Sequence, residues 1–342
     1  MNNSLFILVC AIAIAAFLSV GIYFLQVPGG EEQDSLARYK FSTVNTLLDD
    51  TLIKPIPLHV ELDLEKVKLG ERLFHDVRLS KDGGLSCASC HNLGTGATQP
   101  IPLAMGINGA VMMRNAPTVF NSGFNFVMNW DGKHITLDKQ ARGVILNPDE
   151  MGGDWHTIIQ RLKQDTVYLK DFNDIYPEGI NERSLVDALV EFEKSLFTPN
   201  SRFDQYLRGD DSALSKDEKE GYQLFTSIGC ISCHQGINIG GNLYQKSGLF
   251  IESSVGNAVS SKDLGRFYVT GKDYDRYVFR VPSLRNIAIT APYFHNGSVE
   301  TLDEAIHLMA KYQLGRDIEK QEVEKIASFL KTLTGTYKGK AL

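Results

Sequence analysis

The stretches "LSCASCHNL" (residues 85–93) and "IGCISCHQG" (residues 228–236) each place two cysteines and a histidine within five positions. The spacing, Cys-x-x-Cys-His, is the same in both copies. The chain contains five cysteines, of which four belong to these motifs and the fifth is Cys10. No cysteine outside the apolar N-terminal run therefore remains for a structural disulfide.

Three kinds of site use a Cys-x-x-Cys pair: a redox dithiol, half of a zinc site, and the thioether attachment of haem c. Zinc ribbons bring their cysteine pairs roughly 15–20 residues apart and need no histidine after each pair. A thioredoxin-like dithiol is a single motif near a βαβ unit. Haem c explains the histidine, which becomes the proximal iron ligand. The motifs thus predict two covalently bound haem c groups, held by Cys87, Cys90, His91, Cys230, Cys233 and His234.

Matching sequence leads into both motifs. Gly70–Phe74 and Gly221–Phe225 share the pattern Gly-x-x-Leu-Phe, which makes an internal repeat. We expect a short helix before each attachment site, with its apolar side chains covering a face or edge of the haem.

Helical periodicity dominates the rest of the chain. Apolar residues recur at three- and four-residue spacing over 184–197 and 322–333, and long alternating strand patterns are absent. Two further helix starts carry the capping-box signal. These pairs are Ser215 with Glu218 and Thr301 with Glu304. The sequence therefore predicts a mainly α protein with irregular loops.

Length and charge narrow the class of protein. A chain of 342 residues exceeds the usual size of one domain, and the polar, turn-rich segment 197–215 is a plausible boundary. We predict one haem domain over 41–200 and a second over 201–342. The net charge of −6 and the absence of a Lys/Arg run argue against nucleic-acid binding.

The N-terminal segment differs from the rest. Residues 5–25 form a run without charges that is long enough, at about 1.5 Å per residue, to cross a bilayer core of roughly 30 Å. A cleaved signal peptide is the alternative, although its apolar region usually covers only about 7–15 residues. We predict that residues 1–28 are a membrane anchor or signal segment, with a transmembrane helix as the preferred interpretation.

Beyond the haem motifs, five stretches match one family in order. They are "RNAPTVFN" (114–121), "NWDGK" (129–133), "LNPDEMGG" (146–153), "FRVPSLRNIAITAPYFHNGSVETLDEAI" (279–306) and "YQLG" (312–315). Together they resemble the bacterial di-haem cytochrome c peroxidases, a group that includes enzymes that oxidise protein tryptophans in methylamine utilisation. The resemblance implies two cytochrome c-like domains, with a peroxidatic haem in the first and an electron-storing, higher-potential haem in the second.

The same resemblance assigns roles to single residues. Met309 lies 14 positions after His295, the family spacing for a methionine ligand to the second iron, whereas the helical pattern alone would make it a core methionine. Glu150 takes the position of the catalytic acid/base and Gln140 that of the distal glutamine. Trp130 matches the tryptophan that the family places between its two haems.

The family also holds a calcium ion, and the resemblance implies ligands for it here. Asn115 would donate its side-chain oxygen, and Thr290 and Pro292 their backbone carbonyls, with water completing the shell. Candidates for contacts to the haem propionates are Arg280, Arg285 and His295.

One position departs from the family pattern. Many members have a histidine seven residues before the Arg of "RNAPTV", which caps the peroxidatic iron until the other haem is reduced. This chain has Ile107 there, and an isoleucine cannot donate to iron. The nearby soft ligands are Met105, Met112 and Met113.

Taken together, the sequence predicts a periplasmic peroxidase, anchored to the inner membrane, that reduces hydrogen peroxide to water. Electrons would come from a small cytochrome c or a cupredoxin, rest on the second haem, and pass by Trp130 to the first. Other classes remain open at this point: an enzyme that oxidises a protein partner, a non-catalytic di-haem electron carrier, and a peroxide sensor. A homodimer is compatible with the sequence.

Overall fold

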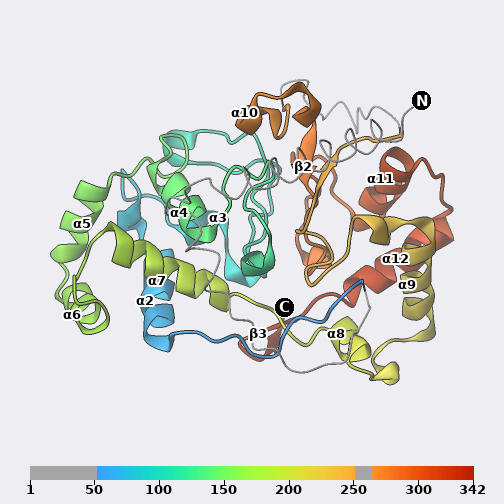
Figure 1. Cartoon of the computed structure of the whole chain (residues 1–342), viewed down its shortest axis with the longest axis horizontal. Helices are drawn as coiled ribbons and strands as arrows, with labels where there is room; N and C mark the ends of the chain where they lie inside the picture. Colours follow the sequence, from blue (N-terminus) through green and yellow to red (C-terminus); the bar gives the residue numbers. More distant parts are fainter. Residues whose placement is uncertain (1–51, 251–262) are drawn as a thin grey trace, which may run out of the picture. The chain divides into compact units, whose positions relative to one another are not determined.

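The structure, a computed structural model, describes residues 52–250 and 263–342 (Figure 1). Helices account for most of its regular structure, which confirms the mainly α prediction. Their bounds are α2 Leu64–Phe74, α3 Cys87–Cys90, α4 Leu137–Leu146, α5 Trp155–Lys163, α6 Thr166–Ile175, α7 Glu182–Ser195, α8 Arg202–Leu207, α9 Lys216–Ile228, α10 Phe267–Thr270, α11 Leu302–Leu314 and α12 Lys320–Lys331.

Strands are few in these residues. β1 (Tyr244–Lys246) pairs antiparallel with β2 (Val278–Arg280), and β3 (Thr336–Tyr337) pairs antiparallel with β4 (Lys340–Ala341). The remaining chain forms loops with short 3₁₀ turns, so long irregular segments carry many of the residues that line the site.

The helices begin close to where the sequence signals place them. α7 and α12 cover the two periodic segments, each shifted by two residues toward the N-terminus. At α9, Ser215 and Glu218 form both bonds of the capping box. At α11, the structure shows only one half of that motif: the Thr301 side chain accepts from the Glu304 backbone N–H.

Two helix pairs form the framework. α2 lies against α7, and α9 lies against α12 (Figure 1). Each contact is close because a glycine faces the partner helix. A Cβ on Gly70 would overlap the carbonyl oxygen of Ala188, and one on Gly221 would overlap that of Lys325. The Gly-x-x-Leu-Phe repeat therefore marks the same helix contact twice.

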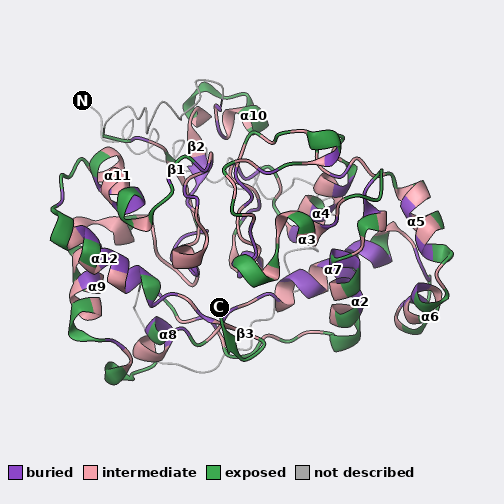
Figure 2. Cartoon of the chain, turned by 180° about the vertical axis from the view of Figure 1, so that it is seen from behind, coloured by how far each residue is buried: buried purple, intermediate pink, exposed green. Residues whose placement is uncertain are grey.

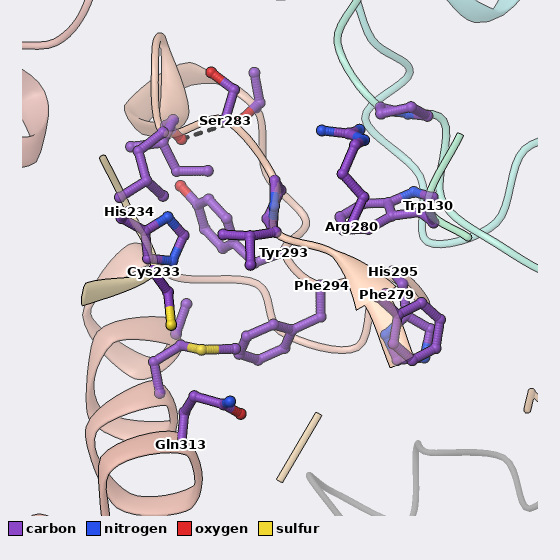
Figure 3. Close-up of a pocket in the computed structure, with 18 of the residues that line it drawn as sticks. Trp130, Cys233, His234, Phe279, Arg280, Ser283, Tyr293, Phe294, His295 and Gln313 are labelled. Carbon is purple, nitrogen blue, oxygen red and sulfur yellow. Dashed lines mark hydrogen bonds between the residues drawn. The ribbon is translucent and has the colours of Figure 1, made fainter. Parts of the chain in front are cut away.

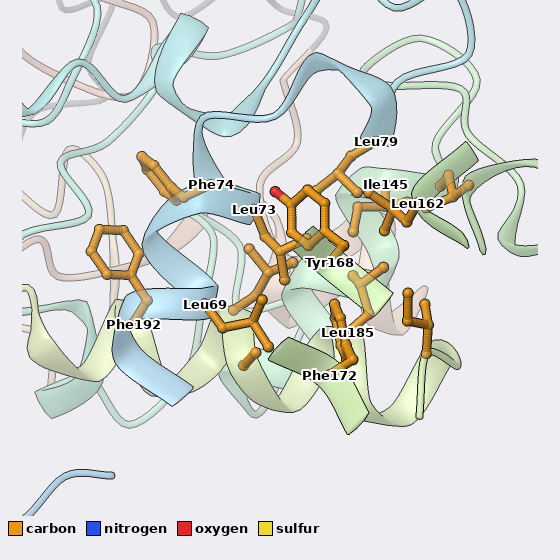
Figure 4. Close-up of a cluster of buried hydrophobic side chains, with 14 of the residues drawn as sticks. Leu69, Leu73, Phe74, Leu79, Ile145, Leu162, Tyr168, Phe172, Leu185 and Phe192 are labelled. Carbon is orange, nitrogen blue, oxygen red and sulfur yellow. The ribbon is translucent and has the colours of Figure 1, made fainter. Parts of the chain in front are cut away.

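Buried apolar side chains gather in two main clusters, one around each helix pair (Figure 2). The first contains Leu69, Leu73 and Phe74 of α2 with Phe192 of α7 (Figure 4). The second contains Phe225 of α9 and several residues of α12. Each end of the described chain packs on the cluster of the other half. Ile53 belongs to the second cluster, while Tyr337 and Leu342 pack on the first. The boundaries at 41–200 and 201–342 remain predictions.

The proposed membrane anchor, residues 5–25, lies outside the described residues. Over 52–250 and 263–342, none of the helices combines the length and the apolar character that a membrane span requires.

Candidate active site

The first Cys-x-x-Cys-His motif lies in the wall of a cavity of about 680 Å³. Cys87 and Cys90 are the first and last residues of the single-turn helix α3, so both thiols lie on one side of it, and His91 follows as the C-cap. Ser86 and Ser89 form a capping box that fixes the start of this turn. The local structure therefore directs all three side chains of the motif to the same cavity.

The second motif lies in the wall of another cavity, of about 250 Å³, where Figure 3 shows Cys233 and His234. Met309 lines the same cavity. Gly229 ends α9 in the left-handed region, with φ of 109°, and a 3₁₀ turn over Cys230–Ser232 starts directly after it. Glycine suits this position because it adopts positive φ without a steric cost. The structure thus brings His234 and Met309, from α11, to the same cavity, as the resemblance implied.

Both histidines are prepared for metal binding. Burial lowers the pKa of His91 and of His234 to about 4, which keeps each imidazole neutral and free to donate a lone pair. The Nδ1 atom of His234 lies 3.2 Å from the carbonyl oxygen of Ile239. An N–H on Nδ1 would leave Nε2 as the donor atom toward the cavity.

Glu150 and Gln140 line the first cavity and do not line the second. Gln140 comes from α4, and Glu150 from the turn that follows it. Burial raises the pKa of the Glu150 carboxyl group above its usual value, and Lys133 and Asn147 offset part of the rise. A raised pKa makes a carboxylate a better proton acceptor, and the acid it forms can return the proton.

The loop opposite Glu150 holds Ile107 away from the cavity. The backbone N–H of Ile107 donates to the Glu150 carbonyl at 3.0 Å. Ile107 is 3% exposed, and its Cδ1 packs on Gly152, where an added Cβ would be only 2.5 Å from it. Ile107 is therefore buried under the loop and does not line the cavity. The cavity is lined instead by Met105, Met112 and Met113.

Trp130 and Arg280 line both cavities. The indole N–H of Trp130 donates to the Asn115 carbonyl at 2.9 Å, which fixes the ring. The Nη1 atom of Arg280 is buried without a hydrogen-bond partner among the described residues, and burial lowers the pKa of this guanidinium to about 10. A buried cation with an unpaired donor fits an anion that enters the cavity.

Of the two candidate arginines, Arg285 is already paired. Its guanidinium lies 2.7 Å from the Asp204 carboxylate, and both side chains are 1% exposed or less. His295, the third candidate, lines the second cavity and stacks on Phe279 at 4.3 Å between ring centroids. Arg280 is therefore the arginine that is free to meet a propionate. Sequence alone could not make this choice, because Asp204 lies far from Arg285 along the chain.

The residues present fit two haem c groups. Each cavity offers two thiols and a neutral imidazole on one wall, Met309 offers its sulfur to the second, and Arg280 lines both with a buried Nη1 that can meet a propionate. Haem supplies one-electron redox chemistry and peroxide activation when it is bound.

The predicted calcium ligands also come together. Asn115, Thr290 and Pro292 all line the second cavity. The Asn115 side-chain NH₂ group donates to the Ile101 carbonyl at 3.0 Å, so the side-chain oxygen of Asn115 points away from Ile101. Within the described ranges, no group of three or more His, Cys, Asp or Glu side chains could hold a metal ion. A calcium site here would therefore depend on amide and carbonyl oxygens.

Sequence reasoning missed two sets of residues near the site. Arg114 pairs with Asp131 at 2.6 Å and with Asp263 at 2.8 Å, which ties the loop beside the first cavity to the later part of the chain. Ser122 and Glu193 line the first cavity with buried, unpaired oxygens. An alignment of the two repeat copies that continued past Gly70 and Gly221 to the helical segments 184–197 and 322–333 could have identified Glu193.

Comparisons with known proteins identify the family of this chain. Residues 64–212 match the family model for di-haem cytochrome c peroxidase. The chain is 45% identical over 286 residues to the cytochrome c peroxidase Ccp of Escherichia coli, covering 83% of this chain and 61% of that protein. It is 41% identical over 297 residues to the cytochrome c551 peroxidase of Nitrosomonas europaea, covering 86% of this chain and 87% of that protein.

The fold agrees as well. The crystal structure of a MauG-like protein associated with microbial copper homeostasis superimposes with a TM-score of 0.72 at 30% identity, covering 85% of this chain and 95% of that one. The resemblance drawn from the sequence motifs is confirmed. The chain belongs to the di-haem cytochrome c peroxidase family.

Proposed function

We propose that this protein reduces hydrogen peroxide to water with electrons delivered one at a time by a small cytochrome c or a cupredoxin. The observation that carries the proposal is the difference between the two cavities. The first contains Glu150 and Gln140 and no sixth ligand from position 107, while the second contains Met309. One cavity is thus suited to peroxide and the other to storing an electron.

The first cavity supplies the proton chemistry. Reduction of one peroxide to two waters consumes two protons and two electrons. Glu150 would take the proton from one peroxide oxygen at its carboxylate and return it to the other as the O–O bond breaks. Gln140 would orient the peroxide through its side-chain amide.

The second cavity and the residues between the two supply electron transfer. Met309 would complete the ligand set with His234, and a thioether ligand favours a higher reduction potential. Trp130 reaches both cavities and would shorten the path between them. Arg280 would hold a propionate through its unpaired Nη1.

A calcium ion would be held by Asn115, Thr290 and Pro292, completed by water. Because these residues also line the second cavity, removing the ion should disturb that haem first. We expect dialysis against a calcium chelator to lower turnover and to change the absorbance of the second haem, and added Ca²⁺ to restore both. Unchanged turnover and spectra after chelation, with metal analysis showing no calcium, would contradict the site.

The proposed location is the periplasm, with residues 1–28 as an anchor in the inner membrane. This segment lies outside the described residues, so the proposal rests on its sequence of uncharged residues. Fractionation of cells that express the full chain tests it, since a cleaved signal segment would release the protein into the soluble periplasmic fraction. A homodimer remains a prediction of the sequence, and light scattering measures it.

Covalent haem content tests the proposed function. Acid-acetone extraction should leave two haems with the polypeptide, because thioethers survive denaturation. The double variant Cys87→Ala with Cys90→Ala should lose one haem and all peroxidase turnover with a reduced small cytochrome c. Cys10→Ala, which changes the cysteine outside both motifs, is the control and should keep both haems.

Full turnover in the double variant would refute the assignment of the first cavity. A wild type with two haems and no turnover of peroxide would favour the electron carrier. Turnover that requires a protein substrate and does not accept a reduced cytochrome c or cupredoxin would favour the enzyme that oxidises a protein partner.

A further inference from the structure

The two helix pairs allow the two cavities to be compared residue by residue. Gly70 contacts Phe192 as Gly221 contacts Phe329, since an added Cβ would lie 2.7 Å and 3.0 Å from the respective phenylalanine Cβ. The phenylalanines that follow the two glycines make matching ring contacts. The ring centroids of Phe74 and Phe192 are 5.2 Å apart, and those of their counterparts Phe225 and Phe329 are 5.3 Å apart. The registers of α7 and α12 therefore correspond, with Phe192 equivalent to Phe329.

The correspondence extends to the loops over the cavities. Asn121 and Asn286 both adopt positive φ, 61° and 63°, and each precedes a 3₁₀ turn. The backbone N–H of Asn121 donates to the Leu196 carbonyl at 2.7 Å, and that of Asn286 donates to the Leu333 carbonyl at 3.2 Å. Because the two asparagines are equivalent, so are the residues that follow them.

These registers pair Ser122 with Ile287 and Glu193 with Leu330. Ile287 and Leu330 both line the second cavity and lie in the apolar cluster around it. Ser122 and Glu193 both line the first cavity. Their elements, the 3₁₀ turn Ser122–Phe124 and α7, are in contact. At the same two places, the first cavity has a hydroxyl and a carboxyl group where the second has only hydrocarbon.

Both polar side chains are buried and their oxygens are unsatisfied. Ser122 is 8% and Glu193 7% exposed, and Ser122 Oγ and Glu193 Oε2 have no hydrogen-bond partner in the part of the chain that the structure describes. A buried polar atom without a partner is costly, so a sequence that keeps two of them at one cavity indicates a ligand or a role.

Within residues 52–250 and 263–342, no opposite charge forms an ion pair with Glu193. Cys87, from α3, is the titratable group with which it interacts, and thioether formation would remove that thiol. Four cations on α7 and on the elements packed against it are engaged in other pairs, namely Arg72 with Asp171, Lys66 with Asp187, Arg142 with Glu182 and Lys194 with Glu191. The other charged side chains that line this cavity are Arg114, Asp131, Lys133, Glu150 and Arg280.

We propose that Glu193 and Ser122 form a proton site that is specific to the first cavity and that takes up one proton from solvent when the haem there gains one electron. The Ser122 hydroxyl lines the same cavity and is a polar group that the second cavity lacks at the matching position. This inference rests on the proposed function, because it requires a haem attached at Cys87 and Cys90. The site tunes the first haem, so Glu193 is a positioning residue and not a catalytic one.

The direction of the coupling follows from charge. An added electron removes one positive charge from the cavity, and the Glu193 carboxylate then loses a favourable interaction. Protonation of the carboxylate restores the charge balance, so one electron and one proton enter together. Burial alone raises the pKa of Glu193 to about 8, which places this exchange near working pH. The reduction potential of the first haem should therefore fall as pH rises through this region.

The test is a spectroelectrochemical titration of the full-chain holoprotein from about pH 6 to about pH 9. The wild type should show a potential for the first haem that falls with rising pH, more steeply than that of the second haem. Glu193→Gln, which keeps the shape and cannot ionise, should abolish the difference between the two haems. The double variant Ser122→Ile with Glu193→Leu, which copies the second cavity, should do the same and should unfold at a higher temperature.

Glu191→Gln is the matched control. Glu191 lies on the same helix, is paired with Lys194 and does not line the first cavity, so this variant should keep the wild-type slope. A wild type whose two haems respond equally to pH, or a Glu193→Gln variant that keeps the wild-type slope, would overturn the proposal. The latter result would assign the coupling to a propionate.

A second measurement uses the wild type alone, so its outcome does not depend on whether the variants fold. The infrared difference spectrum of the wild type on reduction of the first haem should gain a band from a protonated carboxyl group, and a spectrum without it would also overturn the proposal. Haem content is measured on the same samples. Fewer than two haems per chain would count against the proposed function, whereas two haems without proton coupling would count against Glu193 and Ser122 alone.

Discussion

At the scale of single residues, burial decides what the Glu150 carboxyl group can do. Replacing it by Gln keeps the shape and removes the proton acceptor, so turnover should fall by roughly 10²–10⁴-fold while haem content and spectra stay unchanged. Steady-state peroxidase assays measure this loss. Asp149→Asn, at the exposed neighbouring position, is the control and should keep wild-type turnover. A loss of less than a few-fold in Glu150→Gln would return Glu150 to an ordinary loop carboxylate.

The raised pKa of Glu150 also predicts a pH dependence. In the proposed reaction Glu150 acts first as a base, so it must be ionised when peroxide binds. Because burial raises its pKa, the ionised fraction falls at a higher pH than for a free glutamate. We expect kcat/KM to decrease as pH falls through that raised pKa, and the decrease should be missing in Glu150→Gln.

Met309 is the second residue whose role can be separated from packing. Replacing it by His exchanges a thioether for a ligand that favours the ferric state, so the reduction potential of the second haem should fall markedly. Redox titration followed by absorbance measures it. Met112→Leu, at the first cavity, should leave that potential unchanged. If Met309→His also leaves it unchanged, Met309 is a core methionine.

At the scale of elements, the glycines at the helix contacts give a stability prediction. An Ala in a helix is ordinarily more stable than a Gly by about 1 kcal/mol, but a Cβ on Gly70 or Gly221 would overlap a backbone carbonyl of the partner helix. We expect Gly70→Ala and Gly221→Ala each to lower the free energy of unfolding by about 1–3 kcal/mol, measured by denaturant titration. Gly123→Ala is the control, since its nearest contact would be 3.7 Å from Lys194 Cα. Equal stability of all three variants would contradict the close helix contact.

The elements also show how far the sequence could be interpreted. Helical periodicity located α7 and α12, and the capping-box spacing of Ser215 and Glu218 located the start of α9. Both signals depend on residues that are close together in the sequence. The choice between Arg280 and Arg285 could not be made, since it depends on Asp204 reaching only one of them. Position 107 was identified as a departure from the family, but the direction of its side chain depends on a contact with Gly152 that no local pattern encodes.

At the scale of the whole molecule, the question is whether the first haem must wait for the second. In a histidine-capped enzyme, an electron on one haem has to release the cap on the other before peroxide can bind. Here Ile107 lies in the core, and the cap is absent at that position. We therefore expect a high-spin first haem in the fully oxidised protein, and peroxide should react with it before any electron is supplied.

Stopped-flow mixing of the oxidised protein with peroxide measures this directly, and a spectral change within the first mixing phase is the expected result. The same protein with its second haem already reduced should react at a similar rate, because no ligand has to leave. A reaction that begins only after one electron has been supplied would contradict the prediction and would mean that another side chain caps the iron. The cavity offers Met105, Met112 and Met113 for that role, so single Met→Leu variants would identify the cap as the one whose loss makes the oxidised protein reactive.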